Sequence, residues 1–182
     1  MRIVGGRFRG RAIAAPPGDA VRPTADRVRE AVFNILAHGG LAVPFAELAV
    51  LDGFAGTGAM GLEALSRGAA SVTLMEIDRA ALAVCRANAR KLGGDAAVLQ
   101  ADCLKPPKAK APCGLVFLDP PYRSGLAAPA LTALARAGLI APGAVCTVEL
   151  SAAEPFTPPP GFVQADERRY GKARVVFVVR GG

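Results

Sequence analysis

The segment from residue 48 to residue 61 restricts the possible folds of this chain more than any other. An apolar run over residues 48–52 predicts a buried strand that ends at Asp52. A glycine-rich loop follows, and a helical pattern then covers about residues 59–67. A strand, a glycine turn and a helix in this order present free backbone N–H groups to a small ligand. We expect four loop residues to contact that ligand: Gly53, Phe54, Gly56 and Gly58.

The rest of the chain alternates between strand and helix patterns, which predicts an α/β fold with helices on both faces of a parallel sheet. The closing pair of strands has no helix between them and should pair antiparallel. We therefore expect one domain over residues 1–182, with a seven-stranded, mostly parallel sheet, the last strand antiparallel, and a basic N-terminal extension. The expected strands are 48–52, Ser71–Glu76, Ala96–Gln100, Gly114–Asp119, Ala144–Leu150, Phe162–Arg169 and Ala173–Val179, and the expected helices are about 25–37, 59–67, Arg79–Leu92 and about 126–137.

The net charge of +7 is concentrated at the two ends of the chain. Residues 1–29 carry seven arginines and two acidic residues, whereas residues 164–180 carry five basic and two acidic residues. This distribution favours a polyanionic partner, with nucleic acid as the first candidate. The alternative is a basic surface that faces solvent and binds no partner.

Several classes of protein are disfavoured by the composition. No apolar run approaches the roughly 20 residues of a membrane helix, and the N-terminus lacks the apolar segment of a signal peptide. We therefore expect a cytoplasmic protein with no membrane partner. The four cysteines and the single histidine, His38, do not have the spacing of a zinc site, so no metal is expected.

The glycine loop alone does not identify its ligand. Gly56, Gly58 and Gly61 match the pattern GxGxxG, and Glu76 lies 20 residues after Gly56. This spacing fits a dinucleotide site in which the acid binds ribose hydroxyls. It equally fits S-adenosylmethionine, and a tight turn in which Gly61 serves helix–sheet packing is the structural alternative.

Three carboxylates distinguish the two cofactors. Asp52, Glu76 and Asp102 stand at or just beyond the ends of successive strands, along the sheet edge where ligands bind. Asp52 can meet an ammonium group, Glu76 a ribose, and Asp102 an adenine amino group, with the N–H of Cys103 beside it. An ammonium, a ribose and an adenine in a row describe S-adenosylmethionine. For Asp102 alone, a helix cap remains the alternative.

The sequence Asp119-Pro120-Pro121-Tyr122, directly after the fourth strand, is the sharpest chemical signal. Two prolines fix φ and remove two N–H donors, so the turn presents acceptors only. The Asp119 carboxylate and the Pro120 carbonyl can both accept from one exocyclic amine, while a planar base stacks on Tyr122. These acceptors would aim the nitrogen lone pair at a methyl group, with the rate coming from positioning and oriented dipoles. A rigid turn at a strand end is the alternative.

With these motifs, the chain resembles the class I amino-methyltransferases, whose signature [NDS]-P-P-[YFW] follows the fourth strand. It resembles more specifically the RsmD family of bacterial 16S ribosomal RNA guanine-N2 methyltransferases. The matching stretches are 2–11, 22–30, 54–67, Glu76-Ile77-Asp78-Arg79 and Asp119-Pro120-Pro121-Tyr122. Gly53 and Thr57 depart from the cysteine and serine that are frequent in the family.

The resemblance implies methylation of one guanine, position 966 in the usual rRNA numbering, in the small ribosomal subunit. It implies S-adenosylmethionine as the cofactor, a catalytic core over residues 41–182, and a basic arm and helix over residues 1–40. Thr24 would close over the methionine end of the cofactor. The arginines at the N-terminus would hold phosphates, namely Arg7, Arg9, Arg11 and Arg22.

Three other functions remain open at this point. A DNA adenine-N6 methyltransferase could use the same Asp-Pro-Pro-Tyr motif, although no inserted target-recognition segment is present. A nicotinamide-dependent oxidoreductase fits GxGxxG but leaves that motif unexplained. A non-catalytic RNA-binding module would not need Asp119. We expect a monomer.

Overall fold

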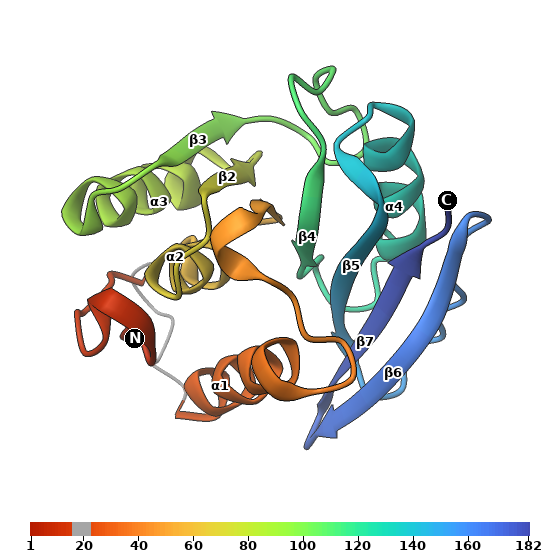
Figure 1. Cartoon of the computed structure of the whole chain (residues 1–182), viewed down its shortest axis with the longest axis horizontal. Coiled ribbons are helices and arrows are strands. Elements are labelled where there is room, and N and C mark those ends of the chain that lie inside the picture. Colours follow the sequence, from red (N-terminus) through yellow and green to blue (C-terminus); the bar gives the residue numbers. More distant parts are fainter. Residues whose placement is uncertain (16–22) are drawn as a thin grey trace.

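The computed structural model describes residues 1–15 and 23–182 and contains one seven-stranded sheet (Figure 1). The strand order is β3-β2-β1-β4-β5-β7-β6. Strand β7 runs antiparallel to both β5 and β6, whereas all the other pairs of neighbouring strands are parallel. The expected mostly parallel sheet with an antiparallel last strand is therefore confirmed. The strands are β1 Ala49–Gly53, β2 Ser71–Glu76, β3 Ala96–Gln100, β4 Cys113–Leu118, β5 Ile140–Ser151, β6 Phe162–Tyr170 and β7 Ala173–Arg180.

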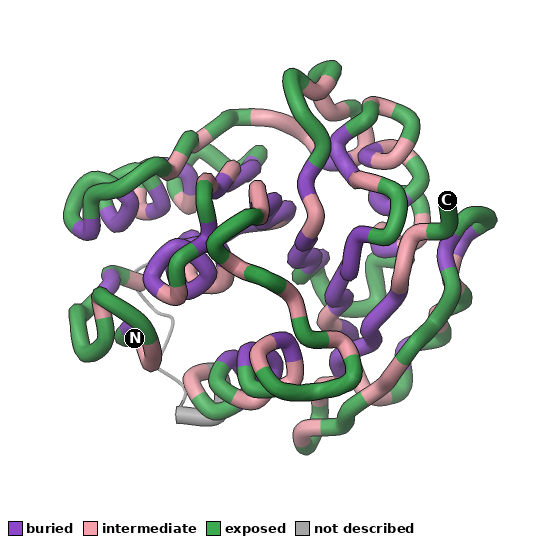
Figure 2. Tube along the Cα trace, viewed as in Figure 1, coloured by how far each residue is buried: buried purple, intermediate pink, exposed green. Residues whose placement is uncertain are grey.

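Helices cover both faces of this sheet. Alternate residues of the central strands face opposite sides, so that Val50 and Leu115 join one buried cluster while Leu51 and Val116 join the other. The first cluster includes the N-terminal segment and α1 to α3, and the second includes α4. Figure 2 shows that α2 and the central strands are mostly buried. The helices are α1 Pro23–His38, α2 Ala59–Ser66, α3 Arg79–Leu92 and α4 Ala127–Arg136, with short 3-10 helices at Gly6–Phe8 and Phe45–Glu47. None of the described helices is long and apolar enough to cross a membrane.

The largest boundary error concerns β5, which begins at Ile140 and not at Ala144. Pro142 and Gly143 resemble a turn in the sequence, but Ile140 pairs with Cys113 across a register shift. Pairing through such an irregularity extends the strand despite unfavourable local residues. Most of the other boundaries agree within one residue.

The N-terminal segment, residues 1–15, packs against the body of the protein. Ile3 and Ile13 are buried, and an antiparallel bridge joins Arg2 to Ala12. At Gly6 an added Cβ atom would lie 1.9 Å from the Ser66 carbonyl oxygen, so only glycine allows this approach to the end of α2. The Ser66 hydroxyl also accepts from the Phe8 N–H at 2.9 Å.

Glu63 of α2 is fully buried and connects three parts of the chain. Its carboxylate accepts from the backbone N–H groups of Val4, at 2.9 Å, and Gly5, at 2.8 Å. It also accepts from the Nε atoms of Arg67, at 2.9 Å, and Arg29 in α1, at 3.4 Å. These bonds replace the water that the charge loses on burial. The N-terminal segment, α1 and α2 are thus held together by one side chain.

We predict that Glu63→Ala lowers the free energy of unfolding by about 3–5 kcal/mol, because it leaves the Nε–H groups of Arg29 and Arg67 and two backbone N–H groups without their acceptor. Urea unfolding measures this difference. Glu30→Ala, at an exposed position of α1, should change stability by less than about 0.5 kcal/mol. Equal effects of the two substitutions would show that Glu63 does not connect these elements.

Candidate active site

Glu76 holds the glycine loop in place at the end of β2. One carboxylate oxygen accepts from the Gly56 N–H, and the other accepts from the N–H groups of Ile77 and Asp78, each at 2.8 Å. Gly56 and Gly58 have φ values of 54° and 79°, which favour glycine. Gly58 is the residue before the first turn of α2. Glu76 therefore shapes the loop in addition to its predicted role as a ribose ligand.

Asp52 connects the end of β1 to α2. Its Oδ2 atom accepts from the Gly61 N–H at 2.8 Å, and the residue is only 3% exposed. Burial raises the pKa of Asp52 to about 7, the charge of Glu76 adds to this rise, and the Gly61 bond opposes it. An added Cβ atom at Gly61 would lie 2.4 Å from Leu74 Cδ2, so Gly61 serves close helix–sheet packing.

Two cavities meet at the carboxyl edge of the sheet. The larger, about 760 Å³, is lined by α1, the glycine loop, the ends of β4 and β5, and the β6–β7 turn. The smaller, about 560 Å³, lies beside Glu76 and Asp102. Phe54, Asp119 and Tyr122 line both cavities. The motif after β4 therefore stands where the two spaces meet.

The Asp119-Pro120-Pro121-Tyr122 turn is anchored on both sides. Pro120 is buried, whereas the Tyr122 ring is 50% exposed and its hydroxyl donates to Glu149 Oε1 at 3.0 Å. Directly after the motif, the Arg123 N–H donates to the buried Glu154 at 2.6 Å. A fixed turn of this kind can hold an acceptor and a ring in one geometry.

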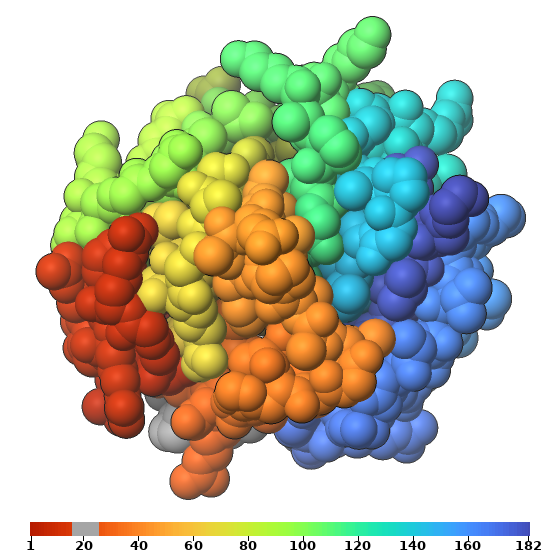
Figure 3. Space-filling view, in the orientation of Figure 1, coloured from red at the N-terminus to blue at the C-terminus, as the bar shows by residue number. Residues whose placement is uncertain are grey.

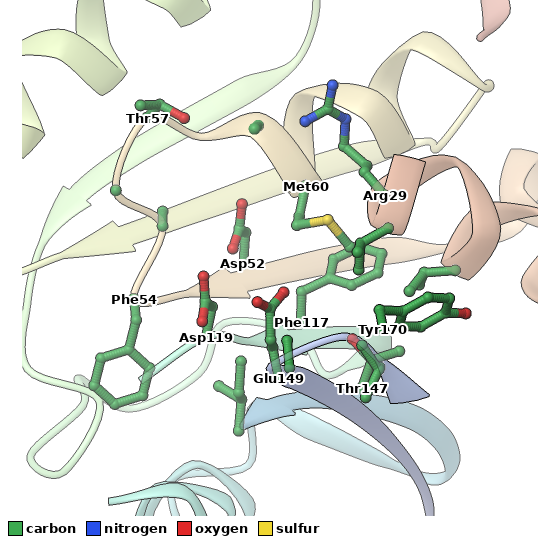
Figure 4. A pocket seen from close by; sticks show the side chains of 18 of the residues that line it. Arg29, Asp52, Phe54, Thr57, Met60, Phe117, Asp119, Thr147, Glu149 and Tyr170 are labelled. Atoms are coloured by element: carbon green, nitrogen blue, oxygen red, sulfur yellow. The ribbon is translucent and has the colours of Figure 1, made fainter. Parts of the chain in front are cut away.

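Three carboxylates point into the larger cavity: Asp52, Asp119 and Glu149 (Figure 4). Asp119 is exposed at the cavities that it lines, although many protein atoms surround its carboxylate. Burial, then the charges of Glu149 and Asp52, raise the pKa of Asp119 well above its ordinary value. Burial also raises the pKa of Glu149, against the hydrogen bond from Tyr122. The cavity is therefore suited to a cation or to N–H donors, although the protein is basic.

Two predicted ligand residues, Gly53 and Cys103, are not among the residues that line the two cavities. The Cys103 thiol is buried 3.7 Å from Met75 Sδ, and burial raises its pKa to about 12. An added Cβ atom at Gly53 would lie 2.8 Å from Leu118 Cδ2, so the absence of a side chain at Gly53 permits this close packing. Asp102 does line the smaller cavity, and its Oδ1 atom accepts from the Leu104 N–H at 2.8 Å.

Three of the predicted phosphate-binding arginines, Arg7, Arg9 and Arg11, are exposed and line neither cavity. Arg7 and Arg11 flank the Phe8 ring at 4.6 and 5.1 Å, and Arg11 also contacts the Leu92 carbonyl at the end of α3. Arg9 is exposed. The segment that carries them (red in Figure 3) and the β6–β7 hairpin (blue) lie on opposite sides of that view.

Two further predicted positions are not covered by the structure. Arg22 and the side chain of Thr24 lie outside the described residues, so their roles stay predictions. Among the residues that are described, no group of three or more His, Cys, Asp or Glu is arranged to hold a metal ion.

The structure adds cavity residues that the sequence analysis missed. Glu149 lies at the carboxyl end of β5, and the rule that selected Asp52, Glu76 and Asp102 would have found it. Ile77, 58% exposed beside Glu76, lines the smaller cavity. Tyr170 and Lys172 line the larger one from the β6–β7 turn, and no local signal marks them.

The family model described as conserved hypothetical protein 95 matches residues 1–179. The chain belongs to this family. Ribosomal RNA small subunit methyltransferase D of Escherichia coli (strain K12) is 42% identical over 151 residues, which cover 82% of this chain and 74% of that protein. The Haemophilus influenzae protein of the same name is 34% identical over 178 residues, which cover 94% and 89%. The resemblance to the RsmD family is therefore confirmed.

Solved structures agree with this assignment. The structure titled putative methyltransferase yhhF from Escherichia coli is 37% identical, has a TM-score of 0.85 and covers 100% of this chain and 98% of its own. Magnesium protoporphyrin IX methyltransferase from Synechocystis, solved with bound S-adenosylmethionine, is 16% identical with a TM-score of 0.66 over 87% and 80%. At that identity the likeness concerns the fold alone. The Rossmann-like class I methyltransferase fold is thus confirmed.

The pKa of Asp52 leads to a pH-dependent prediction. The folded protein binds the Asp52 proton more tightly than the unfolded chain does, so ionisation of Asp52 costs stability as pH rises from 5 to 8. Asp52→Asn can still accept from Gly61 but removes this cost. Relative to wild type, the free energy of unfolding of the variant should therefore rise by about 2–3 kcal/mol over that interval.

Chemical denaturation at pH 5, 6, 7 and 8 measures this difference. Asp95→Asn, at an exposed position, should show no such trend. A difference between Asp52→Asn and wild type that does not change with pH would mean that Asp52 titrates normally.

Proposed function

We propose that this protein transfers a methyl group from S-adenosylmethionine to the exocyclic N2 of a specific guanine in the 16S rRNA of the small ribosomal subunit. The observation that carries the proposal is the place of Asp119-Pro120-Pro121-Tyr122 at the junction of two cavities. A cofactor in one cavity and a base in the other would meet at this motif. The names of the relatives support ribosomal RNA as the substrate.

The smaller cavity and the glycine loop fit the cofactor. Glu76 accepts one hydrogen bond from the glycine loop and two from the residues that follow it in the chain. An ionised carboxylate has about four lone-pair sites, which leaves room for a ribose hydroxyl. Asp102 and the exposed Ile77 line the same cavity and would hold an adenine by its amino group and its ring face. Asp52 faces the larger cavity and would attract an ammonium group. The bound cofactor supplies an electrophilic methyl group on a sulfonium.

On the base side, the chain provides acceptors and a stacking surface. The Asp119 carboxylate and the Pro120 carbonyl would accept from the two N2 hydrogens, while the Tyr122 ring lies against the base. Because neither Pro120 nor Pro121 has an N–H group, no backbone donor of these residues competes for the lone pair. The Asp119 carboxylate, which lines both cavities, would also stand close enough to take up the proton that leaves N2. Positioning then supplies most of the rate.

Methyl transfer from labelled cofactor to small subunits that lack the modification tests this function, with naked rRNA and duplex DNA as parallel substrates. Label should appear on one guanine N2 of the subunit. We expect Asp119→Ala to lower turnover by about 100-fold or more, as for the loss of other preorganised groups, while cofactor affinity changes little.

Asp95→Ala, which alters an exposed carboxylate, is the control and should retain wild-type turnover. Label on DNA adenine in place of rRNA would replace the proposed substrate. Full activity of Asp119→Ala would remove that residue from the mechanism.

We further expect the N-terminal arginines to contact rRNA phosphates. Replacing Arg7, Arg9 and Arg11 with alanine should weaken binding to the subunit and reduce the slope of log K against log salt by about 2. Fewer released counterions are the physical reason. Binding measured over a series of salt concentrations gives both quantities.

The control has the same change in net charge on another surface. Lys108, Lys110 and Arg136 are exposed. The loop that carries the two lysines lies beside the end of α4, which carries Arg136, because the Ala109 N–H donates to the Ala137 carbonyl. Their replacement with alanine should leave the slope nearly unchanged. Equal slopes for both triple variants would exclude the N-terminal segment from the interface.

A further inference from the structure

Glu149 stands next to Asp119 on the neighbouring strand. Leu118 of β4 pairs with Val148 of β5 in parallel register, and both of these side chains are buried in the same cluster. Side chains alternate along a strand, so the next residues, Asp119 and Glu149, turn to the opposite face together. Figure 4 shows both carboxylates pointing into the larger cavity.

This carboxylate pair lacks a cationic partner within the described part of the chain. None of the ion pairs between described residues includes Asp119 or Glu149. Arg29 and Lys172 also line the cavity. The Arg29 guanidinium is bound to Asp26, Glu63 and the Arg2 carbonyl, and Lys172 forms no ion pair with either carboxylate. The Tyr122 hydroxyl donates to one oxygen of Glu149. Because Glu149 lines the larger cavity, its second oxygen is available to a hydrogen-bond donor there.

Guanine offers adjacent donors that match two such acceptors. Its N2 amine and its N1–H lie side by side on one edge of the ring. In adenine and cytosine, by contrast, the ring nitrogen next to the amine carries a lone pair. A carboxylate beside the amine site therefore attracts N1–H of guanine and repels the ring nitrogen of the other two bases.

We propose that Glu149 accepts a hydrogen bond from N1–H of the target guanine and so selects guanine over other amino-bearing bases. Tyr122 orients Glu149 through its hydroxyl and contacts the same base with its ring. Asp119 and Pro120 accept hydrogen bonds from the N2 amine, while Glu149 accepts from the adjacent N1–H of the ring. The inference rests on the proposed function, because it names the group that the site recognises next to N2.

The test compares two substrates that share the reacting amine. Small subunits are reconstituted with guanine or 2-aminopurine at the methylated position. The analogue keeps the 2-amino group, but its N1 is a lone-pair acceptor. We measure kcat/KM for both particles with wild type, Glu149→Gln and Glu149→Ala, and confirm folding by thermal unfolding. Glu47→Gln, at an exposed position, is the matched control.

Wild type should prefer guanine by roughly 10–100-fold, the factor expected for one hydrogen bond to a charged group. The Glu149→Gln side chain can accept from N1–H or, after rotation, donate to N1 of the analogue, so its preference should fall to a few-fold. Glu149→Ala should also lose most of the preference, and Glu47→Gln should keep the wild-type value. The missing O6 of the analogue affects every variant and cancels in the comparison.

An active wild type whose preference is unchanged in both Glu149 variants would overturn this inference and leave the proposed function standing. A merely structural role of Glu149 would lower both rates together and keep their ratio, and it would also overturn the inference. A wild type that methylates neither particle would overturn the proposed function and this inference with it.

Discussion

The buried carboxylate of Glu63 is the interaction on which the shape of the active site depends. It binds two N–H groups of the N-terminal segment and the guanidinium of Arg29 in α1, while it belongs to α2 itself. Met1, Val28 and Arg29 form part of the wall of the larger cavity. Since no sheet strand supplies this wall, Glu63 holds it in place together with the buried apolar residues of α1 and the N-terminal segment.

The carboxylates at the sheet edge divide into two groups. Glu76 and Asp52 bind the backbone of the glycine loop and of α2, and thus shape the loop that would hold the cofactor. Among the described residues, no backbone N–H group donates to the side chains of Asp119 and Glu149, and both face the larger cavity. A basic surface around an acidic interior suits a polyanionic substrate whose reacting base presents N–H donors.

Local sequence rules predicted most of the sheet. Strands that are buried on both faces appear as short apolar runs, and glycines mark the turns between elements, so both can be recognised over short distances in the chain. They placed Asp52, Glu76, Asp102 and Asp119 at one edge correctly. They assigned Gly53 to the ligand, which stays a prediction, and this glycine also leaves space for Leu118 and Cys103. The sequence alone does not tell whether a glycine is needed for close packing between distant segments or for contact with a ligand. The division into residues 1–40 and 41–182 stays a prediction.

The sequence by itself determined the α/β class, the order of its elements and the place of the Asp-Pro-Pro-Tyr motif at the end of β4, since each depends on residues close in the chain. Only the tertiary structure decided which side chains share the cavity. Glu149 meets Asp119 because β5 pairs with β4 in a given register, and Tyr170 and Lys172 arrive through the β6–β7 turn. The partners of Glu63 lie up to 59 residues away. Contacts of this kind depend on the register and packing of whole elements, which no local pattern contains.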